Sequence, residues 1–335
     1  MGTRPGEFDL IGKYLRPLAS SENGAADLTD DAAVLKPKDG HHLVVTMDTL
    51  VAGVHFLEFT PPHYVAAKTL RVNLSDLAAM GAQPAWYTLS LSLPSEDCGI
   101  YGTDWLDIFA QTLGVEQALY GISLVGGDTV ATPGPLSLSV TALGWVKTGQ
   151  EIYRSGAQLK DIVYVSGAIG DATLGLSAVQ GGYSEIDTSN LEIITERYHR
   201  PQPRLELGRR LFGLATAAID ISDGLVQDLG HICKTSNVCA TIRADDVPLS
   251  MVGRSLVESD PGLINNLLSG GDDYELLFTV PSDRQNAVTA LSDELDLPLT
   301  PIGVVEHSSE DNQVMVVDGA GKPITLPSSG YRHFD

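Results

Sequence analysis

Seven aspartates in short motifs are the residues of this sequence best suited to chemistry, because each lies against an apolar run. They are Asp30 and Asp31 in LTDDAAVL, Asp48 in VVTMDTLV, Asp76 in NLSDLAAMGA, Asp128 in GGDT, and Asp220 and Asp223 in IDISDGL. A buried carboxylate without a partner is costly, so each needs a compensating positive charge. The chain has 43 Asp and Glu but only 21 Lys and Arg. We therefore expect metal ions as the partners, and hard oxygen ligands of this kind favour Mg²⁺.

A simpler interpretation is that aspartate and glycine only mark turns and helix N-termini. It accounts for Asp128 or Asp223 taken singly, and less well for all seven aspartates together. The motifs follow or interrupt apolar segments in both halves of the chain, so we expect them at strand ends and turns. Because α/β folds usually bind ligands at strand ends, the motifs are expected to share one cleft.

Composition and missing motifs argue against several other classes of function. The net charge of −22 repels phosphate backbones and anionic lipid surfaces, so neither a nucleic acid nor a membrane is expected as a partner. Cys98, Cys233 and Cys239 form neither a CxxC pair nor a cluster with histidine, which argues against a zinc site and a disulfide framework. The sequence contains no P-loop, no kinase HRD or DFG set, no GxSxG and no HExxH.

The N-terminal residues lack the apolar core of a secretory signal, and no segment approaches the roughly 18 apolar residues of a membrane span. These two features predict a cytoplasmic protein.

Strand-like and helix-like segments alternate along the chain and must position the motifs. In the first half, strands are expected at 42–51, 87–93 and 135–146, and helices at 62–80 and 103–120. The polar stretch KTGQEIYRSGAQLKD, which follows Trp145, predicts a domain boundary, so the domains are expected to be 1–148 and 149–335.

The second half begins with the strand-like IVYVS and a glycine turn that leads into a helix near 171–180. The aspartate there, in GD at 170–171, is a candidate helix cap that could meet an anion. Helices are expected within 190–213, and strands near 238–243, 274–280 and 301–318. This mixed order predicts an α/β or α+β fold in two domains.

A set of motifs in a fixed order resembles the thiamine-monophosphate kinase family. The motifs are GEFDLI, DDAAVL, DTLVAGVHF, NLSDLAAMGAQPAW, GGDT, RSGA, AIDISDGL and GGDDYELLF, and the match extends from Gly6 to Tyr331. NLSDLAAMGA alone is shared with a wider superfamily of ATP-dependent synthetases, which includes aminoimidazole ribonucleotide synthetases. The resemblance implies a two-domain synthetase-like fold that dimerises through the sheet of its N-terminal domain, with a C-terminal α/β domain closing the active-site cleft.

The resemblance also implies an activity, transfer of the ATP γ-phosphate to thiamine monophosphate, and a set of site residues. Several Mg²⁺ ions should be held by six aspartates: Asp31, Asp48, Asp76, Asp128, Asp220 and Asp223. ATP should contact Gly127, Asp128, Arg154 and Ser222, and thiamine monophosphate should contact His55, Asp272 and Tyr331. Judged by residue type alone, a histidine such as His55 is more often satisfied and partly buried than a ligand. Arg154 could equally be an ordinary surface arginine, and Tyr331 could only close the core.

Three positions depart from the family pattern. Thr29 stands where a glycine usually precedes the acid pair, and it would be strained if the backbone there requires a positive φ. Met47 replaces a common Thr or Ser, so a hydroxyl contact to metal is lost. Asp272 replaces the commoner Glu and shortens that side chain by one methylene.

The chemistry agrees with the resemblance. A phosphate monoester has a second pKa near 6, so the acceptor is already largely a dianion at pH 7 and needs no general base. The difficulty is to bring two anions together, which carboxylate-bound Mg²⁺ solves by neutralising charge and aligning in-line attack. Two other functions stay open: a related synthetase that acts through an acyl- or imidoyl-phosphate, and a non-catalytic protein that binds divalent ions.

Overall fold

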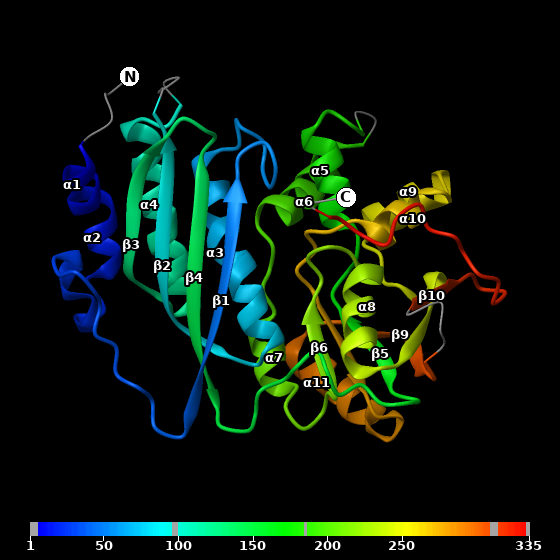
Figure 1. The fold of residues 1–335 in the computed structure, drawn as a ribbon. Coiled ribbons are helices and arrows are strands. Elements are labelled where there is room, and N and C mark those ends of the chain that lie inside the picture. Colours follow the sequence, from blue (N-terminus) through cyan, green and yellow to red (C-terminus); the bar gives the residue numbers. More distant parts are fainter. Residues whose placement is uncertain (1–5, 96–99, 184–185, 309–313, 333–335) are drawn as a thin grey trace. The chain divides into compact units, whose positions relative to one another are not determined.

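The chain folds into two compact units in the computed structural model. The structure describes residues 6–95, 100–183, 186–308 and 314–332. The first unit is Met1–Leu77 with Ala82–Thr148, and the second is Ala78–Gly81 with Gly149–Asp335. Each unit combines a sheet with helices, as the mixed α/β prediction requires (Figure 1). Cys98 lies outside the described residues, and Cys233 and Cys239 are buried free thiols. None of the described helices is long and apolar enough to cross a membrane.

A four-stranded sheet forms the centre of the first unit. Its strands are β1 (His41–Val51), β2 (Gln83–Pro94), β3 (Ser123–Thr132) and β4 (Ser137–Lys147), in the order β1-β4-β2-β3. β4 is antiparallel to both β1 and β2, and β2 is parallel to β3. Helices α3 (Pro62–Ala79) and α4 (Thr103–Tyr120) lie on one face of this sheet (Figure 1).

Alternation along the strands gives this sheet one face that α3 and α4 cover (Figure 1). Tyr87, Leu89 and Leu91 of β2 are fully buried beneath the helices, and the residues between them are half-buried. Between the two helices, Arg71 of α3 forms a buried ion pair with Glu116 of α4, with 2.8 Å between Nε and Oε2. A pair of this kind fixes how the helices meet, because neither charge can be buried alone.

The other face of the sheet carries an exposed apolar stripe on the edge strand β1. The stripe consists of Leu43, Val45 and Met47, which are 44%, 56% and 62% exposed. Since neighbouring residues of a strand point to opposite faces, these three side chains lie opposite those of Thr46 and Asp48. A row of exposed aliphatic residues on an edge strand favours association with another protein surface.

Short helices precede the sheet and lie beside β3. They are α1 (Glu7–Leu10), the π-helix η1 (Ile11–Leu15), α2 (Arg16–Ala19) and the 3₁₀ segment η2 (Asn23–Leu28). The chain takes positive φ values at Ala26, Asp27 and Leu28, whereas Thr29 has φ −108°. The strain considered for Thr29 is therefore absent, because the turn that needs a left-handed backbone ends one residue earlier.

A six-stranded sheet forms the centre of the second unit. Its strands are β5 (Ile162–Ser166), β6 (Ala217–Asp220), β7 (Cys239–Arg243), β8 (Leu276–Val280), β9 (Leu299–Glu306) and β10 (Val314–Val317). The order is β10-β7-β9-β5-β8-β6, antiparallel except for the parallel pair of β10 and β7.

Helices cover both faces of this second sheet. Val163 and Val165 of β5 pack in the cluster that contains Leu229 of α8 (Leu225–Ser236). Tyr164, on the opposite face, packs in the cluster of α7 (Leu205–Arg210) and α11 (Gln285–Leu295). A further apolar cluster joins α5 (Asp171–Val179), α6 (Thr188–His199), α9 (Met251–Ser259) and α10 (Leu263–Ser269). The 3₁₀ turns are η3 (Ala244–Asp246) and η4 (Ser282–Arg284).

Candidate active site

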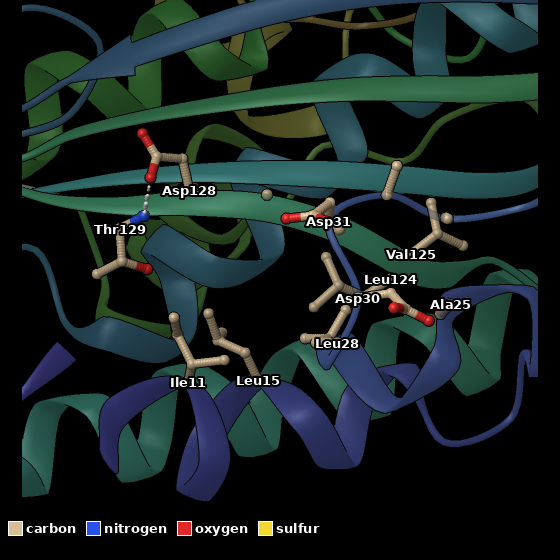
Figure 2. Close-up of a pocket in the computed structure, with 14 residues that line it drawn as sticks. Ile11, Leu15, Ala25, Leu28, Asp30, Asp31, Leu124, Val125, Asp128 and Thr129 are labelled. Carbon is tan, nitrogen blue, oxygen red and sulfur yellow. Dashed lines mark hydrogen bonds between the residues drawn. The ribbon is translucent and has the colours of Figure 1, made fainter. Parts of the chain in front are cut away.

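Asp30, Asp31 and Asp128 line one pocket in the first unit (Figure 2). Its walls come from the N-terminal helices, the segment 28–33 and strand β3, and Ile11 and Leu15 form an apolar side. None of the three carboxylates forms an ion pair with a lysine or arginine among the residues that the structure describes. All three are exposed, so the burial that the sequence suggested for them is absent, but their oxygens are of the kind that Mg²⁺ binds. Among the described His, Cys, Asp and Glu side chains, only Asp223, Asp228 and His231 place three potential ligand atoms within 4.8 Å of one another.

Gly127 has a steric reason to be glycine. A Cβ on this residue would lie 1.9 Å from the carbonyl oxygen of Leu89 on the neighbouring strand β2. Next to it, the Asp128 carboxylate accepts a hydrogen bond of 2.9 Å from the Thr129 N–H (Figure 2). The close strand packing at Gly127 therefore sets the position from which Asp128 reaches the pocket.

Asp48 and Asp76 form a second group, between β1 and α3. The Thr46 hydroxyl donates to Asp76 Oδ2 over 2.5 Å, and the Asp48 N–H donates to Asn73 Oδ1 over 3.0 Å. Asn73 is fully buried, and its amide group donates to the Thr69 carbonyl oxygen within α3. These bonds hold residues 46–48 against the helix, which places two of the expected metal-binding carboxylates on the same side of the sheet.

Strand order separates these two groups within one chain. β4 and β2 lie between β1 and β3, so the Cα atoms of Asp48 and Asp128 are about 14 Å apart at three strand spacings. Asp48 is in register with Val140 and Leu89 on the helix-covered face, whereas Asp128 pairs with Ser90, whose side chain points to the opposite face. Since Mg²⁺ binds oxygens at about 2.1 Å, one ion cannot join them within a single chain.

The expected location of the motifs at strand ends and turns is wrong for three aspartates. Asp48 and Asp128 lie inside β1 and β3, and Asp76 lies inside α3. Asp220 is the last residue of β6, and Asp223 lies in the turn that follows, as expected. The apolar residues around the first three belong to the elements themselves, so they gave no indication of an end.

His55 lies in a tight loop after β1, and its ring is already oriented. The Val51 N–H donates to His55 Nδ1 over 3.0 Å, and buried Lys68 donates to the His55 carbonyl oxygen over 3.2 Å. Because Nδ1 accepts a hydrogen bond, the neutral ring carries its proton on Nε2. The main chain of Val51 thus sets the tautomer of this ring.

In the second unit, the turn after β6 is built around Asp228 of α8. Its Oδ2 accepts hydrogen bonds from the N–H groups of Ser222, Asp223 and Gly224, at 3.0, 3.1 and 3.1 Å. Asp228 is buried, and burial together with the nearby Asp223 raises its pKa to about 7. Asp223, Asp228 and His231 each place one potential ligand atom within 4.8 Å of the others.

Two further segments bind to the same turn. The Asp272 N–H donates to the Ser222 carbonyl oxygen over 2.9 Å, and the Tyr274 N–H donates to that of Ile221 over 2.8 Å. The Tyr331 N–H donates to the Asp223 carbonyl oxygen over 3.0 Å. The structure thus brings together Ser222, Asp223, Asp272 and Tyr331, four residues that come from three distant parts of the sequence.

Glu275 fixes the segment that carries Asp272. The buried Glu275 carboxylate accepts hydrogen bonds from Ser166 Oγ over 2.5 Å, from Arg197 over 2.7 Å, and from Arg204. Asp272 and Tyr274 have φ values of 70° and 50°, a left-handed backbone that aspartate adopts more readily than most residues. The departure from the family pattern at 272 therefore places a well-suited residue in this conformation.

Asp273 occupies the N-terminus of α5, where the sequence suggested an anion. Its carboxylate accepts hydrogen bonds from the Gly170 and Ala172 N–H groups, at 2.8 and 3.3 Å. Burial is the main cause that raises the Asp273 pKa, to about 8. The chain's own Asp273 side chain thus occupies the position where the sequence suggested an external anion.

The raised pKa of Asp273 predicts a pH-dependent contribution to stability. The native chain keeps a proton that the unfolded chain releases near pH 4, so this contribution is complete below that pH and is lost as the pH rises through about 8. In urea unfolding, the free energy of unfolding of the wild type should fall with pH over this range, by up to about 1.4 kcal/mol per pH unit relative to that of Asp273→Asn. Parallel pH profiles of the two proteins would contradict it.

Arg154 lies on the surface of the second unit, near the C-terminal end of α8. Its carbonyl oxygen accepts a hydrogen bond of 3.0 Å from the Thr235 hydroxyl. Its guanidinium acts on His231, whose pKa is lowered first by burial and then by Arg154. Because Asp223 acts on the same histidine in the opposite direction, Arg154 belongs to the surroundings of the Asp223 turn.

Two family models match consecutive parts of the chain. Residues 29–146 match AIR synthase related protein, N-terminal domain, and residues 160–315 match AIR synthase related protein, C-terminal domain. With two mixed α/β units in this order and carboxylates gathered in each, the fold is that of the AIR synthase related class.

Individual similar proteins show which family within this class the chain belongs to. Thiamine-monophosphate kinase of Escherichia coli (strain K12) is 41% identical over 330 residues, 98% of each chain. The crystal structure of thiamine-monophosphate kinase from Stenotrophomonas maltophilia K279a is 44% identical, with a TM-score of 0.79 over 89% of this chain and 91% of that one. The structure of AaThiL complexed with AMPPCP and TMP is 32% identical, with a TM-score of 0.76 over 98% and 97%. The chain belongs to the thiamine-monophosphate kinase family, as its motifs predicted.

Proposed function

We propose that the chain transfers the γ-phosphate of ATP directly to thiamine monophosphate, giving thiamine diphosphate, with Mg²⁺ as the cofactor. The observation that carries this proposal is the turn at 221–224, where Ser222 and Asp223 are hydrogen-bonded to the segments of Asp272 and Tyr331. Groups expected to bind the nucleotide and groups expected to bind the thiamine substrate thereby share one support. The related AaThiL structure, which holds AMPPCP and TMP together, supports the same pairing of ligands.

The carboxylates fit the proposed metal. Hard oxygen atoms of the kind that Mg²⁺ prefers come from Asp31 and Asp128 in the pocket, from Asp48 and Asp76 where β1 meets α3, and from Asp220 and Asp223 at the end of β6 and in the turn after it. When bound, Mg²⁺ supplies charge neutralisation between two anionic substrates and alignment of the reacting phosphates.

The main-chain groups of Ser222 are already engaged, which restricts how it can bind ATP. Its N–H donates to Asp228, and its carbonyl oxygen accepts from the Asp272 N–H. Only the hydroxyl is left for a nucleotide. Gly127, Asp128 and Arg154 are the other proposed ATP contacts, while His55, Asp272 and Tyr331 orient the thiamine substrate. No enzyme nucleophile is needed, because the acceptor phosphate is ionised near pH 7.

Product analysis tests this function. The purified chain, incubated with ATP, Mg²⁺ and thiamine monophosphate, should form ADP and thiamine diphosphate in equal amounts. Release of ADP and inorganic phosphate with an amide or carbonyl substrate would instead indicate a superfamily synthetase. Binding of Ca²⁺ or Mg²⁺ without any ATP turnover would indicate a divalent-ion binding protein.

We further propose a homodimer formed through the apolar stripe on β1, in the cytoplasm, where ATP is available. The stripe of Leu43, Val45 and Met47 is apolar, and Leu43 is in register with Trp145 of the neighbouring strand β4. A second copy of the chain can cover such a face isologously.

Val45→Asp is expected to convert the dimer to a monomer at micromolar concentration, because it would bury two symmetry-related charges without partners. Light scattering after size-exclusion chromatography measures the mass. Ile108→Asp, on an exposed position of α4, is the matched control and should leave the mass unchanged. A monomeric wild type, or a dimeric Val45→Asp variant, would contradict this interface.

A further inference from the structure

We propose that Asp228 is a positioning residue that supports the nucleotide side and the thiamine side of the site at once. The inference rests on the proposed function, since it concerns the arrangement of the same site. Its carboxylate forms three hydrogen bonds to consecutive main-chain N–H groups, those of residues 222–224. These bonds hold the turn in a shape that the local sequence alone does not enforce.

The turn depends on a glycine and on an acceptor for its N–H groups. Gly224 has φ 132°, a backbone that L-residues rarely adopt, and a Cβ there would lie 2.6 Å from the Ser269 carbonyl oxygen. Three successive N–H groups that point to one side would also repel each other unless an acceptor lies between them. Asp228 supplies that acceptor from one turn inside α8, where the helix holds it in place.

The partners of the turn connect Asp228 to the other site residues. The carbonyl oxygens of Ile221, Ser222 and Asp223 accept the N–H groups of Tyr274, Asp272 and Tyr331, respectively. The N–H groups of the turn thus face Asp228, and its carbonyl oxygens face the segments expected to bind thiamine monophosphate. A shift of the turn moves both sets of groups together.

Gln227 reinforces this connection. Its amide donates to Asp223 Oδ2 over 2.9 Å and to the Tyr331 carbonyl oxygen over 2.7 Å. It therefore joins the side chain of a proposed metal ligand to the C-terminal segment. Gln227 and Asp228 are adjacent on α8, so the first turn of this helix organises both halves of the site.

A positioning role predicts an effect that no single ligand contact produces. Asp228→Leu removes the acceptor and should raise the KM for ATP and the KM for thiamine monophosphate together, each by about 10-fold or more, since misplacement by about 1 Å can cost on the order of 100-fold. Asp228→Asn keeps one acceptor oxygen and should stay within about 3-fold of the wild type. Asp272→Ala should raise mainly the KM for thiamine monophosphate.

Hydrogen exchange gives a readout that does not depend on activity. The amides of residues 222–224 should exchange at least about 10-fold faster in Asp228→Leu than in the wild type, and at nearly wild-type rates in Asp228→Asn. Asp161→Leu is the matched control. Asp161 is a buried acid that accepts hydrogen bonds from the Gln158 N–H over 2.8 Å and from the Thr216 hydroxyl. Thr216 directly precedes β6, so Asp161 lies at the end of this strand that is away from the turn.

The outcomes separate the inference from the function on which it rests. If the wild type makes no thiamine diphosphate, the proposed function fails, while the exchange experiment still shows whether Asp228 holds the turn. If Asp228→Leu folds and leaves both KM values and the exchange of residues 222–224 unchanged, the inference is overturned. The same holds if Asp161→Leu raises both KM values equally, because general destabilisation would then explain the effect.

Discussion

Asp128→Asn is expected to reduce phosphate transfer by more than about 100-fold, with the fold intact. Loss of a group that only orients a metal ligand costs up to about 100-fold in activity. The loss at Asp128 should be larger, because Asp128 is proposed to bind the metal itself. The amide keeps the size of the side chain but removes the negative charge beside Asp30 and Asp31. Since like charges oppose each other in the metal-free protein, the variant should be as stable as the wild type or slightly more stable.

Two measurements check this prediction, steady-state turnover at saturating Mg²⁺ and a thermal unfolding scan without metal. Asp39→Asn is the matched control, because Asp39 is an exposed acid of the same unit in the turn before β1. Near-normal turnover of Asp128→Asn at saturating Mg²⁺ would show that Asp128 does not hold the metal. A large drop in unfolding temperature would instead assign it a structural role.

A mixed dimer is expected to recover activity that neither parent variant has. Asp48 and Asp128 cannot share an ion within one chain, because two strands lie between β1 and β3. If the proposed dimer makes them neighbours, each site uses Asp48 of one protomer and the partner's Asp128. A dimer of one Asp48→Asn chain and one Asp128→Asn chain then has one intact site and one site that lacks both carboxylates.

Co-expression with two different affinity tags isolates this mixed dimer. We expect about half of the wild-type activity per dimer, against almost none for either homodimer, because one of two symmetric sites is restored. The control is a mixed dimer of Asp48→Asn with Asp76→Asn, two residues on the same side of one sheet, which should remain inactive. An inactive Asp48→Asn and Asp128→Asn pair would show that each chain holds its own ions.

The sequence predicted the mixed fold and the family, but it predicted local surroundings less well. The strong period-2 pattern of β4 identified that strand, because one face of it is buried throughout. β3 was missed as a strand, since its glycines at 126 and 127 suggested a turn, whereas Gly127 allows close packing against β2. Composition cannot distinguish these two uses of glycine.

The sequence did not predict the residues that position the site, Asp228 and Gln227, for a related reason. Asp228 and Gln227 stand in the first turn of a helix, where acidic and amide residues are common on exposed faces. Their importance comes from bonds to main-chain groups and to residue 331, about a hundred positions away. Glu275 carried a weak signal, because an acid directly before the apolar LLFTV run must be buried with partners.

The brief passage of the chain through the second unit at 78–81 has a consequence for dissecting the protein. Ala78 and Ala79, at the end of α3, pack in the apolar cluster that contains Leu207 and Phe278. A fragment that starts at Gly149 would lack these two residues and would expose that part of the cluster to water. Residues 149–335 alone therefore lack part of their own core, and no single cut between the two halves of the sequence yields two complete cores.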